Sequence, residues 1–214
     1  MTITTSFRTL FKTRLRKSAL GLLSLSTGLG AIGLLSGCSS VEPRFYSLAP
    51  ISGSIPTQFS MPSKGSIEVH TASVPLRLDR DRIVQGRERY RLKLADAASW
   101  SEPLGDMLTQ TLVSDIAQRL PNRVIFAQNQ FVALEPTDFV DLAVQNFEQD
   151  ENGYAVINGV ISVEQKRSPQ NSATSLPFHW VSPQPVSADP QALVAALSEG
   201  VGVIADQAVN LLQQ

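Results

Sequence analysis

The clearest pattern of apolar positions predicts a helix over residues 102–120. Apolar residues recur there at every fourth position, which places them on one stripe of a helix: Leu104, Leu108, Leu112, Ile116 and Leu120. Ser99 or Ser101 is a suitable N-cap, and Pro121 ends the pattern. We therefore expect one face of this helix to be buried.

A second helix is expected from residue 190 almost to the C-terminus. Asp189 is a good N-cap, and Pro190 suits the first helical position because proline lacks the N–H that a helix start leaves unpaired. The apolar stripe then runs through Leu193, Ala196, Leu197, Val201, Ile204, Ala208 and Leu211. This helix should also bury one face.

Alternation of apolar and polar residues predicts strands, at residues 45–48, 67–75, 124–126, 138–148, 154–164 and 178–181. A turn at residues 150–153 joins two of them into a hairpin, and residues 83–84 and 90–94 suggest another hairpin around a turn at 85–87. The order of strands, helix, strands and helix implies an α/β (α+β layered) fold. Its sheet is mainly antiparallel or mixed, with two amphipathic helices packed on one face.

The N-terminal stretch has the composition of an export signal. Its five charged residues are all basic (Arg8, Lys12, Arg14, Arg16 and Lys17), and residues 18–37 are uncharged and rich in Leu, Gly and Ala. About 20 apolar residues cross a bilayer as a stable helix, but several serines and glycines interrupt this run. It is typical of a cleaved signal peptide, which we place at residues 1–37.

Leu35, Ser36 and Gly37 stand directly before Cys38 and resemble the lipobox read by lipoprotein signal peptidase. The Cys38 thiol would take up diacylglycerol, followed by N-acylation, and no other cofactor is expected. Cys38 is the single cysteine, so the chain forms no internal disulfide. A buried free thiol is the alternative reading of a lone cysteine. The position after the apolar run favours lipidation.

The residues after Cys38 suggest where the lipoprotein resides. In lipoproteins that resemble this chain, aspartate in that place favours retention in the inner membrane, whereas serine allows transfer. Ser39 and Ser40 therefore favour the periplasmic face of the outer membrane. Residues 38–64 are rich in proline and serine and predict an extended tether, followed by one domain over residues 65–214.

Removing the leader changes the charge of the chain. About 177 residues remain, enough for one domain with a sizeable core. They hold 13 Lys and Arg against 19 Asp and Glu, a net charge of about −6. This balance argues against nucleic acid, or an anionic lipid surface, as the main partner.

Several segments together resemble a known family, in the order in which they stand here: residues 45–48, 74–84 and 98–104, Phe147, and the helix around 192–197. With the lipobox, they are similar to the auxiliary lipoprotein of ABC-type transport systems, the PqiC-like family. The resemblance implies a non-enzymatic component of a machine that moves lipids between the inner and outer membranes. Its partners would be MCE-domain and ABC-transporter membrane proteins. A homo-oligomer stays open.

No motif for catalysis stands out, although a hydrolase built from scattered Ser, His and Asp is not excluded. His70 and His179 lie in strand-like segments and are interpreted as structural. Trp100 is interpreted as core, with an exposed interface anchor as the alternative. The charged loop with Leu78, Asp79, Arg80 and Arg82 is either a solvated loop or a site that docks a partner. Two other functions remain open, a lipid carrier with its own apolar pocket and a structural envelope lipoprotein.

Overall fold

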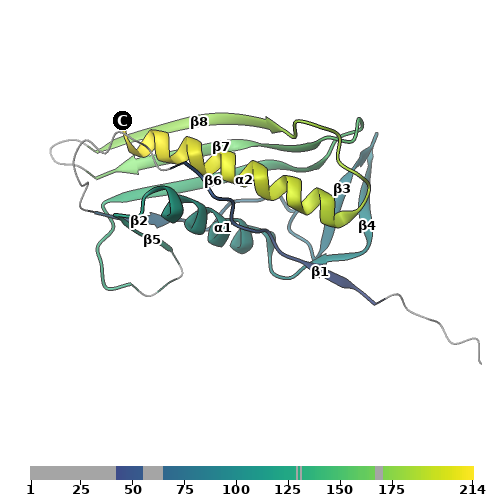
Figure 1. The fold of residues 1–214 in the computed structure, drawn as a ribbon, viewed down its shortest axis with the longest axis horizontal. Coiled ribbons are helices and arrows are strands. Elements are labelled where there is room, and N and C mark those ends of the chain that lie inside the picture. Colours follow the sequence, from purple (N-terminus) through teal and green to yellow (C-terminus); the bar gives the residue numbers. More distant parts are fainter. Residues whose placement is uncertain (1–41, 55–64, 129, 131, 167–170) are drawn as a thin grey trace, which may run out of the picture. The chain divides into compact units, whose positions relative to one another are not determined.

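The computed structural model describes residues 42–54, 65–128, 130, 132–166 and 171–214. The predicted lipobox, Leu35 to Cys38, lies outside these residues, as does part of the predicted tether. The described part forms two sheets and two helices, and its core is dominated by the larger sheet (Figure 1). The predicted α+β fold with a mixed sheet is confirmed.

The larger sheet has five strands in the order β5-β2-β6-β7-β8. Their bounds are Ser66–Val69 for β2, Val124–Ala127 for β5, Asp138–Gln149 for β6, Ala155–Gln165 for β7 and Ser172–Val181 for β8. Strand β2 is parallel to both of its neighbours, and β6, β7 and β8 run antiparallel. The β6–β7 turn contains Gly153 at a φ of 88°, a conformation that glycine adopts without strain.

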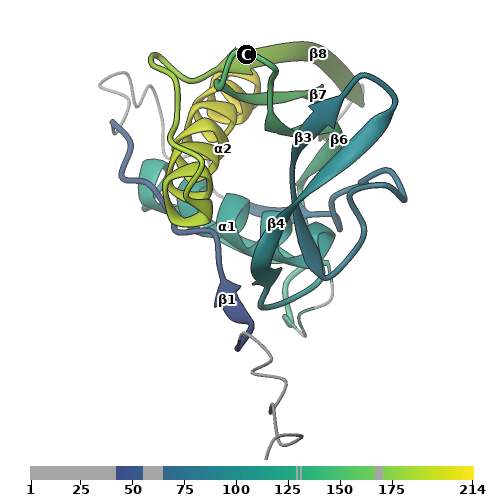
Figure 2. The ribbon, with the colours of Figure 1, turned by 90° about the vertical axis from the view of Figure 1, so that its right-hand side faces the viewer.

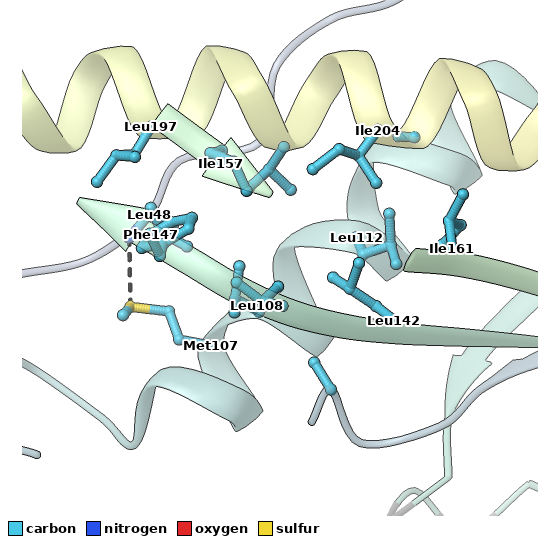
Figure 3. Close-up of a cluster of buried hydrophobic side chains, with 14 of the residues drawn as sticks. Leu48, Met107, Leu108, Leu112, Leu142, Phe147, Ile157, Ile161, Leu197 and Ile204 are labelled. Atoms are coloured by element: carbon cyan, nitrogen blue, oxygen red, sulfur yellow. Dashed lines mark hydrogen bonds between the residues drawn. The ribbon is translucent and has the colours of Figure 1, made fainter. Parts of the chain in front are cut away.

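Helices α1 (Leu104–Arg119) and α2 (Pro190–Leu212) both cover the same face of this sheet (Figure 1). The pattern of burial along β7 explains this arrangement. Its buried side chains alternate with half-exposed ones along the whole strand, so one face of the sheet is apolar and is covered. The buried set faces the helices and includes Ile157 and Ile161 (Figure 3). Helix α2 is long and apolar enough to span a membrane by length and composition, but most of it is buried in the domain, as expected for a core helix.

A smaller sheet of three strands lies at one end of the domain (Figure 2). Strand β4 (Arg91–Trp100) is its centre, paired antiparallel to β3 (Arg82–Glu88) and parallel to β1 (Arg44–Tyr46). The strand predicted in the segment 45–48 is present, but it ends at Tyr46. It joins two parts of the chain that are far apart in sequence.

Three local predictions were wrong. The hairpin does not turn at residues 85–87, because β3 continues to Glu88 and the turn lies at Arg89 and Tyr90. Gly86 allows close packing instead, since a Cβ there would lie 2.5 Å from the Gln149 carbonyl oxygen. Helix α1 has no side-chain cap; Ser99 belongs to β4, and the Ser101 hydroxyl is bonded to that of Ser47. The strand predicted to reach residue 75 ends at Val69.

Candidate functional site

The segment that follows β1 crosses the helical layer and is bound there through its backbone. We call residues 47–53 the strap. The backbone N–H of Leu48 donates to Met107 Sδ at 3.3 Å (Figure 3), and Leu48 itself is buried in the core. The N–H of Ala49 donates to Ser198 Oγ at 3.1 Å. Both helices therefore hold the strap.

Arg119 fastens the strap further along. Its side chain is buried, and Nη1 donates to the carbonyl oxygen of Ile51 at 3.0 Å. Nη2 donates to the carbonyl oxygen of Gly202 at 2.9 Å, and Nε donates to Asp206 Oδ1 at 2.5 Å. The guanidinium thus links α1, α2 and the strap. A buried charge needs such a set of partners, because desolvation without them is costly.

Asp115 completes this cluster. It has no exposed surface, and its Oδ1 accepts a hydrogen bond from the Ile51 N–H at 2.7 Å. Burial raises the pKa of the Asp115 carboxyl to about 6, although the bond from Ile51 and the charge of Arg119 act in the opposite direction. The strength of the hydrogen bond from the Ile51 N–H to Asp115 therefore depends on the protonation state of Asp115.

The structure divides the four residues of the predicted docking loop. Leu78 is buried in the core, with 1% of its surface exposed, so it offers a partner no contact. Asp79, Arg80 and Arg82 are exposed, and the loop that carries the first two is fixed by a bond from the Leu78 N–H to the Pro75 carbonyl oxygen at 2.8 Å. Asp79 and Arg80 are thus presented on this loop, and the exposed Arg82 follows as the first residue of β3.

This loop lies beside the strand through which the N-terminal segment joins the domain. Arg82 pairs with Ser99 of β4, and Ser99 pairs with Phe45 of β1. Phe45 and Arg82 are therefore two strand spacings apart, about 10 Å. Sequence reasoning missed this proximity because the β1–β4 pairing is long-range and only three residues wide.

The two histidines and Trp100 are held in structural contacts with neighbouring side chains. His70 Nδ1 is bonded to Asp141 Oδ1 at 2.8 Å, and His179 is bonded to Asn158. Trp100 is buried, as interpreted from the sequence, with its ring 6.2 Å from that of Phe147. Within the described ranges, no cluster of three His, Cys, Asp or Glu side chains could hold a metal ion.

A cleft of about 560 Å³ opens between the β3–β4 hairpin and the β6–β7 turn. Its lining is mainly charged or polar and includes Arg87, Arg89, Lys93, Asp150 and Glu151. Acyl chains need an apolar lining. This cleft therefore gives no support to the alternative of a lipid carrier.

Comparison with known proteins gives a consistent result. A family model described as "ABC-type transport auxiliary lipoprotein component" matches residues 46–209. The fold is similar to the crystal structure of an uncharacterized protein at 19% identity and a TM-score of 0.59, over 80% of this chain and 99% of that one. It is also similar to a Xanthomonas campestris protein of the family DUF330 at 18% identity and a TM-score of 0.57, over 78% and 92% of the two chains. A search of curated proteins finds no match.

Proposed function

Because the chain belongs to the family of ABC-type transport auxiliary lipoprotein components, we propose that it serves an MCE-type system that moves lipids between the two membranes. In this role it is anchored to the periplasmic face of the outer membrane through lipids on Cys38. It contacts MCE-domain and ABC-transporter membrane components and performs no catalysis itself.

The bound strap is the observation that carries the proposal. Six peptide units separate Cys38 from Arg44, the first residue of β1, and such a segment spans at most about 20 Å. From Arg44 onward the chain is paired with β4, and the strap that follows is fastened to α1 and α2. Two or three acyl chains on Cys38 hold firmly to a bilayer. The domain would therefore sit close to the leaflet that holds its lipids.

This geometry shortens the tether that the composition of residues 38–64 predicts. A flexible chain of that length would allow the domain to move far from the membrane. With residues 44–53 bound, a transport partner that reaches the outer membrane would meet the domain at a nearly fixed height. That arrangement suits a docking or receiving element.

Co-purification tests the proposed partnership. We expect an epitope-tagged chain, crosslinked in intact envelopes, to co-purify an MCE-domain membrane protein. Arg80→Glu reverses one exposed charge of the docking loop and should reduce recovery by at least about tenfold, because charge reversal weakens binding to a complementary surface and tenfold corresponds to only about 1.4 kcal/mol. Lys166→Glu reverses an exposed charge elsewhere and should not change it.

Two outcomes would count against the partnership. Recovery of the chain without any MCE-domain protein would contradict the transport role. Equal recovery with Arg80→Glu and Lys166→Glu would show that the loop is not the docking site.

A further inference from the structure

The smaller sheet and its adjoining loop combine positive charge with exposed apolar side chains. We call residues 75–94 together with β1 the basic end. We propose that, when no transport partner is bound to the loop with Arg80, the basic end rests on the anionic lipid surface of the leaflet that holds the Cys38 anchor. The inference depends on the proposed lipid anchor and adds a second contact with the same membrane.

Charge is strongly segregated in the chain after the leader. Residues 75–94 contain seven basic residues, Arg77, Arg80, Arg82, Arg87, Arg89, Arg91 and Lys93, against three acidic ones, Asp79, Asp81 and Glu88. Their net charge is about +4, and the remaining residues from 38 onward carry about −10. Acids outside the segment offset part of this charge, because Arg87 Nε lies 3.2 Å from Glu148 and Arg82 Nη2 lies 3.8 Å from Asp96. An excess of about +2 remains at this end, and the overall value of about −6 conceals it.

The three most exposed large apolar side chains among the described residues all belong to the basic end. Tyr90 at the hairpin turn is fully exposed, Leu76 in the loop is 86% exposed, and Phe45 in β1 is 66% exposed. Figure 2 looks onto the end of the domain where β1, β3 and β4 lie. Aromatic and aliphatic side chains among arginines are typical of surfaces that enter the headgroup region of a bilayer.

The hairpin turn carries a local strain that fits this role. Arg89 has a φ of 54°, in the left-handed region that favours glycine, at the first residue of a two-residue turn. A non-glycine residue there costs about 1 kcal/mol. The turn therefore holds a positive charge beside Tyr90 at the expense of its own stability.

The position of the predicted Cys38 anchor favours a lipid surface, and not an acidic protein, as the partner of the basic end. Strand β1 belongs to the basic end, and at most about 20 Å of chain separates it from Cys38. Attraction between exposed charges and an anionic leaflet extends over a Debye length of about 8 Å. Strand β1 is thus the part of the basic end that the anchor keeps nearest to the membrane. The hairpin turn at Tyr90 lies at the opposite end of β4 from the β1 pairing, so it meets the leaflet when the smaller sheet lies along the membrane.

A single-thiol experiment tests the contact with the mature lipoprotein itself. Acylation blocks Cys38, so Leu76→Cys and Tyr90→Cys each introduce the only free thiol. Val203→Cys, at an exposed position of α2, is the matched control. Each protein is labelled with an environment-sensitive fluorophore and reconstituted into phosphatidylcholine vesicles with or without phosphatidylglycerol.

In anionic vesicles we expect nitroxide-labelled lipids to quench the probes at 76 and 90 at least about twofold more strongly than the probe at 203. High salt should reduce the difference, because it screens the arginines. Arg89→Gly in the Leu76→Cys protein should weaken quenching while raising the melting temperature. Lys166→Gln, which removes an exposed charge outside the basic end, should leave quenching unchanged.

The outcomes separate this inference from the proposed function. Acylated protein whose probes at 76 and 90 stay as accessible to water as the probe at 203 contradicts the lipid contact alone. If those probes become buried only when an acidic envelope protein is added, the occupant is that protein and the inference is wrong. A mass spectrum without acyl chains on Cys38 contradicts the proposed function, and the inference falls with it.

Discussion

Asp115 shows at the level of one residue how the fold holds its N-terminal segment. One carboxyl oxygen accepts the Ile51 N–H, and the other has no hydrogen-bond partner among the described residues. A buried, half-satisfied carboxyl is more stable when protonated, which accounts for the pKa of about 6. The strap is therefore fastened by a group that titrates near neutral pH.

We predict that Asp115→Asn changes how stability depends on pH. Because the pKa of Asp115 is raised from 3.8 to about 6 on folding, the folded state binds more protons between these values. The free energy of unfolding of the wild type should therefore fall, relative to Asp115→Asn, by up to about 3 kcal/mol as pH rises from about 4 to about 7. Urea unfolding at both ends of the range measures this difference.

Asp106→Asn is the matched control, because Asp106 is a half-exposed acid on the same helix. It should unfold with the same pH dependence as the wild type. Parallel curves for the wild type and Asp115→Asn would show that the carboxyl is ionised throughout this range, and the account of its burial would be wrong.

At the level of elements, the close approach of α2 to the larger sheet depends on one small residue. A Cβ at Gly200 would lie 2.5 Å from Ile157 Cδ1 and 2.7 Å from Trp180 Cε3. Both neighbours are held by packing in the sheet, where voids are few. Glycine is therefore required for contact between these layers, although it weakens a helix interior.

Gly200→Ala should lower the free energy of unfolding by about 1 to 3 kcal/mol, because overpacking outweighs the gain in helix propensity. Glu199→Ala changes the exposed neighbouring residue and should be neutral or slightly stabilising. Thermal unfolding of the two variants provides the comparison. A stabilised Gly200→Ala would show that helix and sheet have room to separate.

The strap can be tested in the same way. A Cβ at Gly53 would come within 2.2 Å of Arg119 Cζ, and Arg119 cannot move away without breaking its bonds to Asp206 and Gly202. We predict that Gly53→Ala loosens the strap and speeds hydrogen exchange of the Ile51 amide by at least about tenfold. The exposed change Ser52→Ala should leave that rate as it is. Unchanged protection in Gly53→Ala would contradict the proposed fastening.

Periodic segments of the fold were predictable, and long-range contacts were not. Both helices, the β6–β7 hairpin and the Asp189 cap follow from local patterns, and the structure contains each of them. The contacts of Asp115 and Arg119 with the strap were missed because both residues read as polar positions of an amphipathic helix. Leu78 read as part of an exposed loop because charged residues surround it. In each case the partners lie far away in sequence, where periodicity carries no information.

At the scale of the molecule, the segment that follows the predicted anchor is part of the folded domain. Strand β1 and the strap connect it to the smaller sheet and to both helices. The positively charged basic end includes β1, so it adjoins the segment that follows the predicted anchor. Anchor, strap and basic end together would fix both the height and the orientation of the domain on a membrane.

The central claim is that the chain is held to its membrane by lipids on Cys38. Mass spectrometry of the N-terminal peptide of the processed protein, purified from envelopes, tests it directly. The account predicts a chain that begins at Cys38 and carries the mass of a diacylglycerol and an N-linked acyl chain, and Cys38→Ser should leave an unacylated precursor. An unmodified Cys38 thiol, or an intact leader in the wild type, would contradict it.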